Sequence, residues 1–124
     1  MTPTAEERDA LFKAFARAFF KRDLDAMYEV VTADFAYSTL HGDEPRVMKT
    51  REEVAAFFDE RAGTQGGSRF EDVVYHHAPE ATFMTYRVIG SDAATGDTFE
   101  RVGIERYTFA DGRIAEKDVY SRPV

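Results

Sequence analysis

The chain has 124 residues, 44% of them hydrophobic, which is enough for one folded domain over residues 1–124 and excludes a disordered segment. A net charge of -7, with Lys and Arg scattered along the chain, argues against nucleic acid as a partner. There is no Cys, no apolar run long enough to cross a membrane and no signal peptide at the acidic N-terminus, so we expect a cytoplasmic domain without disulfides or thiolate metal sites.

Three helices are expected in the first half of the chain. Residues 4–7 (TAEE) have the spacing of a capping box, and aromatic residues follow at helical intervals to about residue 21. Asp23 can cap a second, shorter helix. Residues 50–53 (TREE) repeat the capping box and begin a third helix, which we expect to end near Gly63. The apolar face of that third helix comprises Val54, Phe57 and Phe58.

Strands dominate the rest of the sequence. A short strand is expected at residues 35–40, followed by a loop whose Gly42 and Pro45 break regular structure. After Gly66 come four segments rich in Val, Tyr, Phe and Thr, separated by turn residues. Helices followed by an antiparallel meander indicate the α+β class, with a curved sheet wrapped around the helices.

The turn at residues 110–112 (ADG) determines which side chains share a face of the last hairpin. A two-residue turn would place like charges opposite each other. A three-residue loop would pair Glu105 with Lys117 and Arg106 with Glu116, and each such opposite-charge pair is worth about 0.2–1 kcal/mol. We therefore expect the three-residue loop.

The two faces of this hairpin differ in character. One mixes an aromatic ring with an ion pair, and we assign it to the interior under the helices: Gly103, Glu105, Tyr107, Lys117 and Val119. The other carries more charge, and we assign it to solvent or to a partner subunit: Ile104, Arg106, Glu116, Asp118 and Tyr120.

The order of these elements resembles the nuclear transport factor two-like superfamily, and within it the SnoaL-like and ketosteroid isomerase-like branch. The motifs that carry the resemblance are KRDLDAMYEVVTADF, GDEPR followed by TREEVAAFF, and FADGRI, and it covers residues 5–123. It implies a cone-shaped α+β fold in which three N-terminal helices pack in a curved, mostly antiparallel sheet (a cystatin-like roll). It also implies a hydrophobic pocket, no cofactor, and a homodimer formed through the sheet.

Ketosteroid isomerases show what the resemblance implies for chemistry. They use a tyrosine on the first helix and a protonated acid on the penultimate strand as an oxyanion hole, with a base aspartate on the strand before the GDEPR-like loop. The acid position falls on Glu105, the tyrosine position on Phe15 and the base position on Thr39. Because Phe has no donor and Thr is no base at neutral pH, authentic steroid isomerisation is not expected.

Glu105 is the main functional candidate, because a carboxylate on a pocket-facing strand is costly unless something compensates it. Desolvation among aromatic rings would make it a neutral donor, whereas a close Lys117 would keep it a charged acceptor. A purely structural ion pair with Lys117 is the alternative. Tyr37 and His41 are further catalytic candidates, since they share one face of the strand that leads to the pocket mouth in this branch, although a solvated loop histidine is the other reading of His41.

The ligand-binding set is less sharply defined. His76 and His77 are adjacent on a strand and cannot both ligate one metal, so no metal site is expected, but His77 is assigned to the pocket side. On the next strand, either Met84, Tyr86 and Val88 or Phe83, Thr85 and Ile89 face the pocket. The expected ligand-binding residues are Phe15, Phe19, Thr39, Phe58, His77, Met84, Tyr86, Tyr107, Lys117 and Val119.

Two functions from different classes are compatible with these residues. The first is a cofactor-independent isomerase, dehydratase or cyclase that acts on a small apolar or aromatic metabolite by acid–base chemistry, with Glu105 as its principal group. The second is a non-catalytic small-ligand-binding or dimerisation domain, which the missing tyrosine and aspartate favour. In both, the partners are a small hydrophobic ligand and a second copy of the chain, with no nucleic acid and no membrane.

Overall fold

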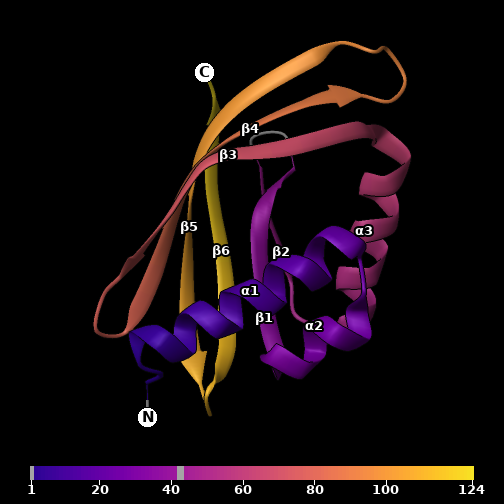
Figure 1. Cartoon of the computed structure of the whole chain (residues 1–124). Helices are drawn as coiled ribbons and strands as arrows, with labels where there is room; N and C mark the ends of the chain where they lie inside the picture. Colours follow the sequence, from indigo (N-terminus) through magenta and orange to yellow (C-terminus); the bar gives the residue numbers. More distant parts are fainter. Residues whose placement is uncertain (1, 42–43) are drawn as a thin grey trace.

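The computed structural model describes residues 2–41 and 44–124, without the side chains of residues 41 and 63–66. The described residues form the helices α1 (Ala5–Lys21), α2 (Leu24–Val30) and α3 (Arg51–Thr64) and the strands β1 (Val31–His41), β2 (Glu44–Met48), β3 (Gln65–His77), β4 (Ala81–Asp92), β5 (Thr98–Ala110) and β6 (Arg113–Pro123). Helix α1 lies across one face of the curved sheet, with α2 and α3 beside it (Figure 1). None of the described helices is both long and apolar enough to span a membrane.

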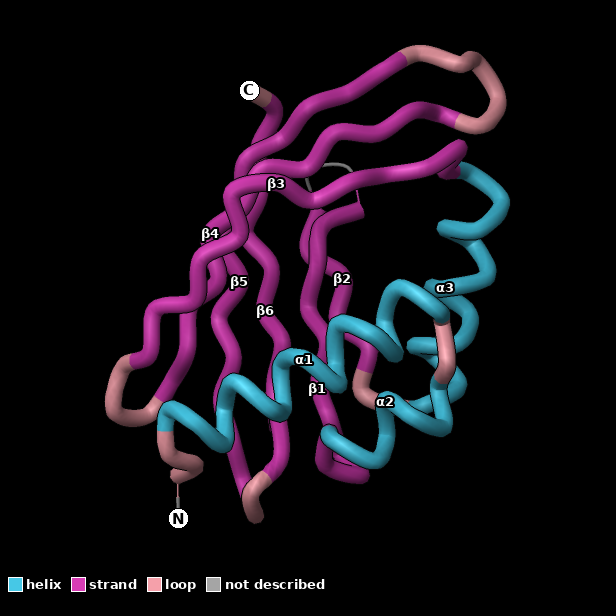
Figure 2. The backbone as a smooth tube through the Cα atoms, in the orientation of Figure 1, coloured by secondary structure: helices cyan, strands magenta, loops and turns pink. Residues whose placement is uncertain are grey.

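A single sheet contains the six described strands in the order β2-β1-β6-β5-β4-β3. Neighbouring strands are antiparallel except for β1 and β6, which run parallel. The sheet bends around the helices (Figure 2). This arrangement confirms the α+β class and the expected packing of three N-terminal helices in a curved, mostly antiparallel sheet.

The helix starts follow the capping signals in the sequence. The Thr4 hydroxyl accepts from the Glu7 amide at 3.2 Å, and the Glu7 carboxylate accepts from the Thr4 amide at 2.8 Å, so the first capping box is confirmed. The expected cap of α2 is also confirmed. At α3 the Thr50 hydroxyl accepts from the Glu53 amide at 3.1 Å, but the Glu53 carboxylate accepts from the Lys49 amide instead of that of Thr50.

The expected loop after the first strand is wrong, because residues 44–48 form strand β2, which pairs with β1. Pro45 is compatible with this strand since β2 is at the edge of the sheet, where one side of the strand needs no ladder hydrogen bonds. Gly42, the other residue that suggested a loop, lies outside the described residues. The first strand is also longer than expected and begins at Val31.

The last hairpin differs from the expected register. Its turn has two residues, Asp111 and Gly112, with φ angles of 52° and 73°, the left-handed values that a tight hairpin turn requires. The next pairs are Phe109 with Ile114, Thr108 with Glu116, Tyr107 with Lys117, Arg106 with Asp118 and Glu105 with Val119. Ala115 is therefore an extra residue in β6, a β-bulge. The predicted three-residue loop and the predicted direct pairs of Glu105 with Lys117 and of Arg106 with Glu116 are wrong.

The bulge nevertheless produces the expected faces. A one-residue shift in register moves every following side chain to the other face of the sheet. The extra residue thus places Lys117 on the inner face with Glu105, and both side chains are buried. Ile104 and Tyr120, on the outer face, are exposed. The bulge also removes the like-charge pairs, which is why charge alone cannot distinguish it from a three-residue loop.

Aromatic side chains of the helices cover the inner face of the sheet. The rings of Phe12 and Phe15 lie 4.8 and 6.0 Å from the ring of Tyr107, centroid to centroid. Phe57 of α3 packs edge-on against Tyr37 at 5.4 Å. This aromatic core surrounds Glu105 and Lys117 and shields both side chains from solvent.

Candidate functional site

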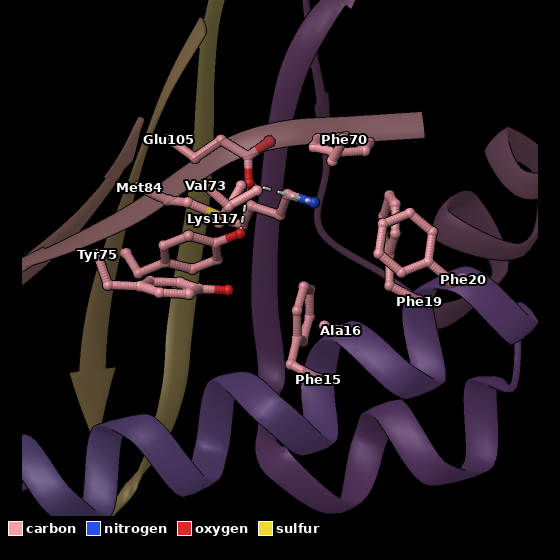
Figure 3. A pocket seen from close by; sticks show the side chains of 11 residues that line it. Phe15, Ala16, Phe19, Phe20, Phe70, Val73, Tyr75, Met84, Glu105 and Lys117 are labelled. Carbon is pink, nitrogen blue, oxygen red and sulfur yellow. Dashed lines mark hydrogen bonds and ion pairs between the residues drawn. The ribbon is translucent and has the colours of Figure 1, made fainter. Parts of the chain in front are cut away.

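Two adjoining cavities lie between α1 and the inner face of the sheet. The first, of about 170 Å³, has mainly apolar walls that include Phe15, Phe19, Phe20, Phe70, Tyr75 and Met84 (Figure 3). The second, of about 260 Å³, has more polar walls that include Tyr37, Thr39, Arg61, Tyr86, Arg101 and Ser121. Four residues line both cavities: Phe19, Phe70, Glu105 and Lys117. The charged pair of the last hairpin thus lies at the boundary between an apolar and a polar compartment.

Lys117 and tyrosine hydroxyls are the polar partners of Glu105. Its Oε1 lies 3.6 Å from Nζ of Lys117, and each of these side chains is only 4% exposed. The Tyr107 hydroxyl donates a hydrogen bond to the same oxygen. Figure 3 shows the side chains of Glu105 and Lys117 close together on one wall of the cavity. A nearby cation and a donated hydrogen bond both favour the ionised form of a carboxyl group. The Glu105 carboxyl group thus has a cation and a hydroxyl donor as partners within the site.

Lys117 lies among aromatic rings. Its Nζ is 3.8 Å from the ring centroid of Phe19, 4.7 Å from that of Tyr37 and 5.2 Å from that of Phe15. Cation–π attraction of this kind stabilises a buried ammonium group. Burial still lowers the pKa of Lys117 from its ordinary value, with the positive charge of Arg61 acting in the same direction and the Glu105 carboxylate opposing both. The ammonium therefore releases its proton more readily than that of an exposed lysine.

Three buried tyrosines face Glu105. Burial raises the pKa of Tyr37, Tyr86 and Tyr107, and the negative charge of Glu105 raises each pKa further. Their hydroxyls therefore remain protonated at neutral pH, and they serve as hydrogen-bond donors rather than as bases. Tyr86 has room because the neighbouring strand carries Gly103: a Cβ atom at that position would lie 2.5 Å from the tyrosine oxygen.

Most of the predicted site residues come together around these cavities. Phe15, Met84 and Tyr107 line the first cavity, Tyr37, Thr39, Tyr86 and Val119 line the second, and Phe19, Glu105 and Lys117 line both. The orientation of β4, which the sequence leaves open, is the one with Met84 and Tyr86 inward, and both are buried. Whether these residues bind a ligand is part of the proposal below.

Three predicted residues lie elsewhere or are not described. His77 is exposed and lines neither cavity: its Nε2 is 2.9 Å from Oδ1 of Asp9 and its Nδ1 is 2.9 Å from Oγ1 of Thr82. The reason is its position at the last residue of β3, beyond Phe70 and Tyr75 of the same strand, which do line the first cavity. Phe58 packs against Phe19 and lines a separate hollow of about 50 Å³. The side chain of His41 lies outside the described residues.

Phe70, Arg61 and Arg101 line the cavities although the sequence pattern did not single them out. Strand β3 changes register between Glu71 and Val74, and this irregularity disrupts the alternation that could have placed Phe70. Arg101 could have been found, because strict alternation backwards from Glu105 puts it on the inner face. Arg61 follows the apolar stripe of α3 and carries no comparable signal.

The family model described as SnoaL-like domain matches residues 12–117. The chain belongs to the SnoaL-like family. This confirms the resemblance seen in the motifs, and with it the nuclear transport factor two-like superfamily. No curated protein matches the chain.

Solved structures agree with the SnoaL-like assignment. An NTF2-like protein from Burkholderia xenovorans is similar with a TM-score of 0.83 and 16% identity, over 96% of this chain and 92% of that chain. A proposed polyketide cyclase from Xanthomonas campestris pv. campestris is similar with a TM-score of 0.75 and 22% identity, over 93% and 90%. TerC, co-crystallised with polyporic acid, is similar with a TM-score of 0.78 and 13% identity, over 92% and 90%. At such identities these structures share the fold with the SnoaL-like chain.

Proposed function

We propose that this SnoaL-like protein is a cofactor-independent enzyme that transfers protons on a small apolar or aromatic metabolite, as an isomerase, dehydratase or cyclase does. The observation that carries the proposal is the position of Glu105, a buried carboxylate at the boundary of the two cavities. Burying a charge is costly and has to be compensated, so a carboxylate in a cavity wall marks a candidate catalytic site. The similar folds of a proposed polyketide cyclase and of TerC with polyporic acid support a ligand of this class.

The geometry supports a division of roles within the cavities. Glu105 accepts a proton from a carbon of the ligand, and Lys117 remains beside it as the compensating cation. The hydroxyls of Tyr37 and Tyr86 donate hydrogen bonds to a ligand oxygen on which negative charge develops. These donors take the place of the tyrosine that the ketosteroid isomerases have on the first helix, where this chain has Phe15. A general base of this kind contributes about 10²- to 10⁴-fold to a rate.

The proposal is tested with a panel of aromatic ketones and phenols, screened by thermal stability. A ligand present at about 100 times its Kd stabilises the folded protein by about 2.7 kcal/mol. For a ligand that is turned over, Glu105→Gln retains binding and loses at least about 10²-fold in kcat. The control is Glu116→Gln, which removes a carboxylate from the outer face of β6 and should leave both quantities unchanged.

A non-catalytic ligand-binding protein is the second candidate. It is favoured by the same contacts of Glu105, because a carboxylate that already has Tyr107 and Lys117 as partners also fits a structural ion pair. The panel distinguishes the two functions. Tight binding without turnover by the unaltered protein contradicts the enzyme and supports the binding protein.

We also propose that two copies associate through the outer face of the sheet. Ile104 and Tyr120 are 38% and 56% exposed there. Together with Val102 and Arg122 they line an open hollow of about 380 Å³. Exposed apolar side chains gathered at a hollow are typical of an interaction surface.

A further inference from the structure

The second cavity carries a charge opposite to that of the whole chain. Among the described residues that line it, Lys117, Arg61 and Arg101 are cationic, and only Glu105 is anionic. The chain as a whole has a net charge of -7. A cationic cavity in an acidic protein is not explained by average composition, and within a low-dielectric wall it concentrates anions.

Polar contacts with the strand β6 hold Arg101 in place. Its Nε donates to Oγ of Ser121 at 3.2 Å, and its Nη2 donates to the main-chain oxygen of the same residue at 3.2 Å. No ion pair among the described residues involves Arg101. A guanidinium group has five N–H donors, so an oriented Arg101 retains donors for an incoming group.

The charges of Arg101 and Arg61 act on the tyrosines at the boundary between the cavities. Arg101 opposes the rise in the pKa of Tyr86, and Arg61 does the same for Tyr37. These two tyrosines are the donors assigned above to a ligand oxygen. At both tyrosines the negative charge of Glu105 has a larger effect than the arginine charge, so the attraction for an anion is centred on the arginines and not on the tyrosine hydroxyls.

We propose that the ligand is an amphiphile with a carboxylate, which binds Arg101 in the second cavity while an apolar or aromatic body occupies the first. This inference rests on the proposed function, because it places the reacting carbon between the two parts, next to Glu105. A carboxylate is preferred since its planar pair of oxygens matches the fork of a guanidinium group. Arg101 is then a residue that determines specificity.

The test compares two probes of the same shape, 2-naphthaleneacetate and 2-naphthaleneacetamide, by isothermal titration calorimetry. The acid should bind the unaltered protein about tenfold more tightly than the amide, as expected for a charge-assisted hydrogen bond. Arg101→Gln should weaken binding of the acid to the level of the amide and leave the amide unchanged. Arg101→Lys should retain part of the preference. Arg87→Gln is the matched control, since Arg87 is exposed on the opposite face of the neighbouring strand.

The outcomes separate this inference from the proposed function. Equal binding of acid and amide to the unaltered protein, or a preference that survives in Arg101→Gln, overturns the carboxylate site and leaves the enzyme proposal standing. A preference lost in Arg101→Gln and in Arg87→Gln alike also overturns it, because the effect would then come from net charge. Failure of both probes to bind the unaltered protein at millimolar concentration contradicts this inference and the ligand cavity together.

Discussion

At the scale of single residues, the site depends on the pairing of Glu105 with Lys117. Each charge is buried, and each is compensated by the other and by the surrounding rings and hydroxyls. Such a pair is no evidence of extra stability, because removing both charges is often neutral, whereas removing one leaves the other uncompensated. The pair is therefore expected to matter more for chemistry than for folding.

Lys117→Met should lower the free energy of unfolding by about 3–5 kcal/mol, because Glu105 would remain buried without its cation. The double variant Glu105→Gln with Lys117→Met should recover most of this loss. Urea denaturation of the parent, both single variants and the double variant measures the coupling between them. If the loss in free energy of unfolding of the double variant equals the sum of the losses of the two single variants, the two residues do not compensate each other.

At the scale of elements, the hairpin of β5 and β6 and its pairing with β4 build the cavity wall. Gly103 of β5 lies opposite Tyr86 of β4, and the absence of a side chain lets the tyrosine ring lie across the strand. This packing directs the tyrosine hydroxyl toward Glu105. A side chain at position 103 would have to displace the ring.

Gly103→Ala should therefore reduce the free energy of unfolding by about 1–3 kcal/mol, the usual cost of overpacking a tight site. On a Tyr86→Leu background the same substitution should cost clearly less, because the ring that meets the new methyl group is gone. Thermal or urea denaturation of the four proteins gives the difference. An equal cost on both backgrounds would mean that Tyr86 does not determine the requirement for glycine.

The elements also show how far the sequence predicts this structure. Capping signals and alternation predict the helices and the inner face of the last hairpin, because both depend on local spacing. The register of the last hairpin is not predictable from charge. A two-residue turn with a bulge at Ala115 and a three-residue loop both avoid the like-charge pairs. Pro45 suggests a loop, yet an edge strand accepts it. The distance of His77 from the cavities depends on how far the cavities extend along β3, which no local pattern encodes.

At the scale of the whole molecule, the two faces of the sheet differ in what they enclose and what they expose. The inner face and α1 enclose the cavities, and the outer face of β5 and β6 leaves Ile104 and Tyr120 exposed. A dimer through the outer face would leave the boundary between the cavities untouched. Assembly and ligand binding should therefore be separable by mutation.

Analytical ultracentrifugation at micromolar concentration should show a dimer, and Tyr120→Lys should shift it to the monomer because a charge would be buried in the contact. Lys13→Glu, on the exposed side of α1, serves as a control for altered surface charge. The cavity probes should bind the Tyr120→Lys variant as they bind the parent. Only monomer in the unaltered protein would remove the proposed dimer.

The most direct test of Glu105 as the proton-transfer group follows the exchange of hydrogen atoms on a bound ligand. In deuterated buffer, NMR spectroscopy records the exchange of the α-hydrogens of 2-tetralone, a bicyclic aromatic ketone, with and without the protein. If Glu105 accepts protons from bound ligands, the protein should accelerate exchange above the buffer rate, and Glu105→Gln should abolish the acceleration while the ketone still binds. Exchange at the buffer rate despite saturation with bound ketone, or acceleration unchanged in Glu105→Gln, would contradict the assignment of Glu105 as the proton-transfer group.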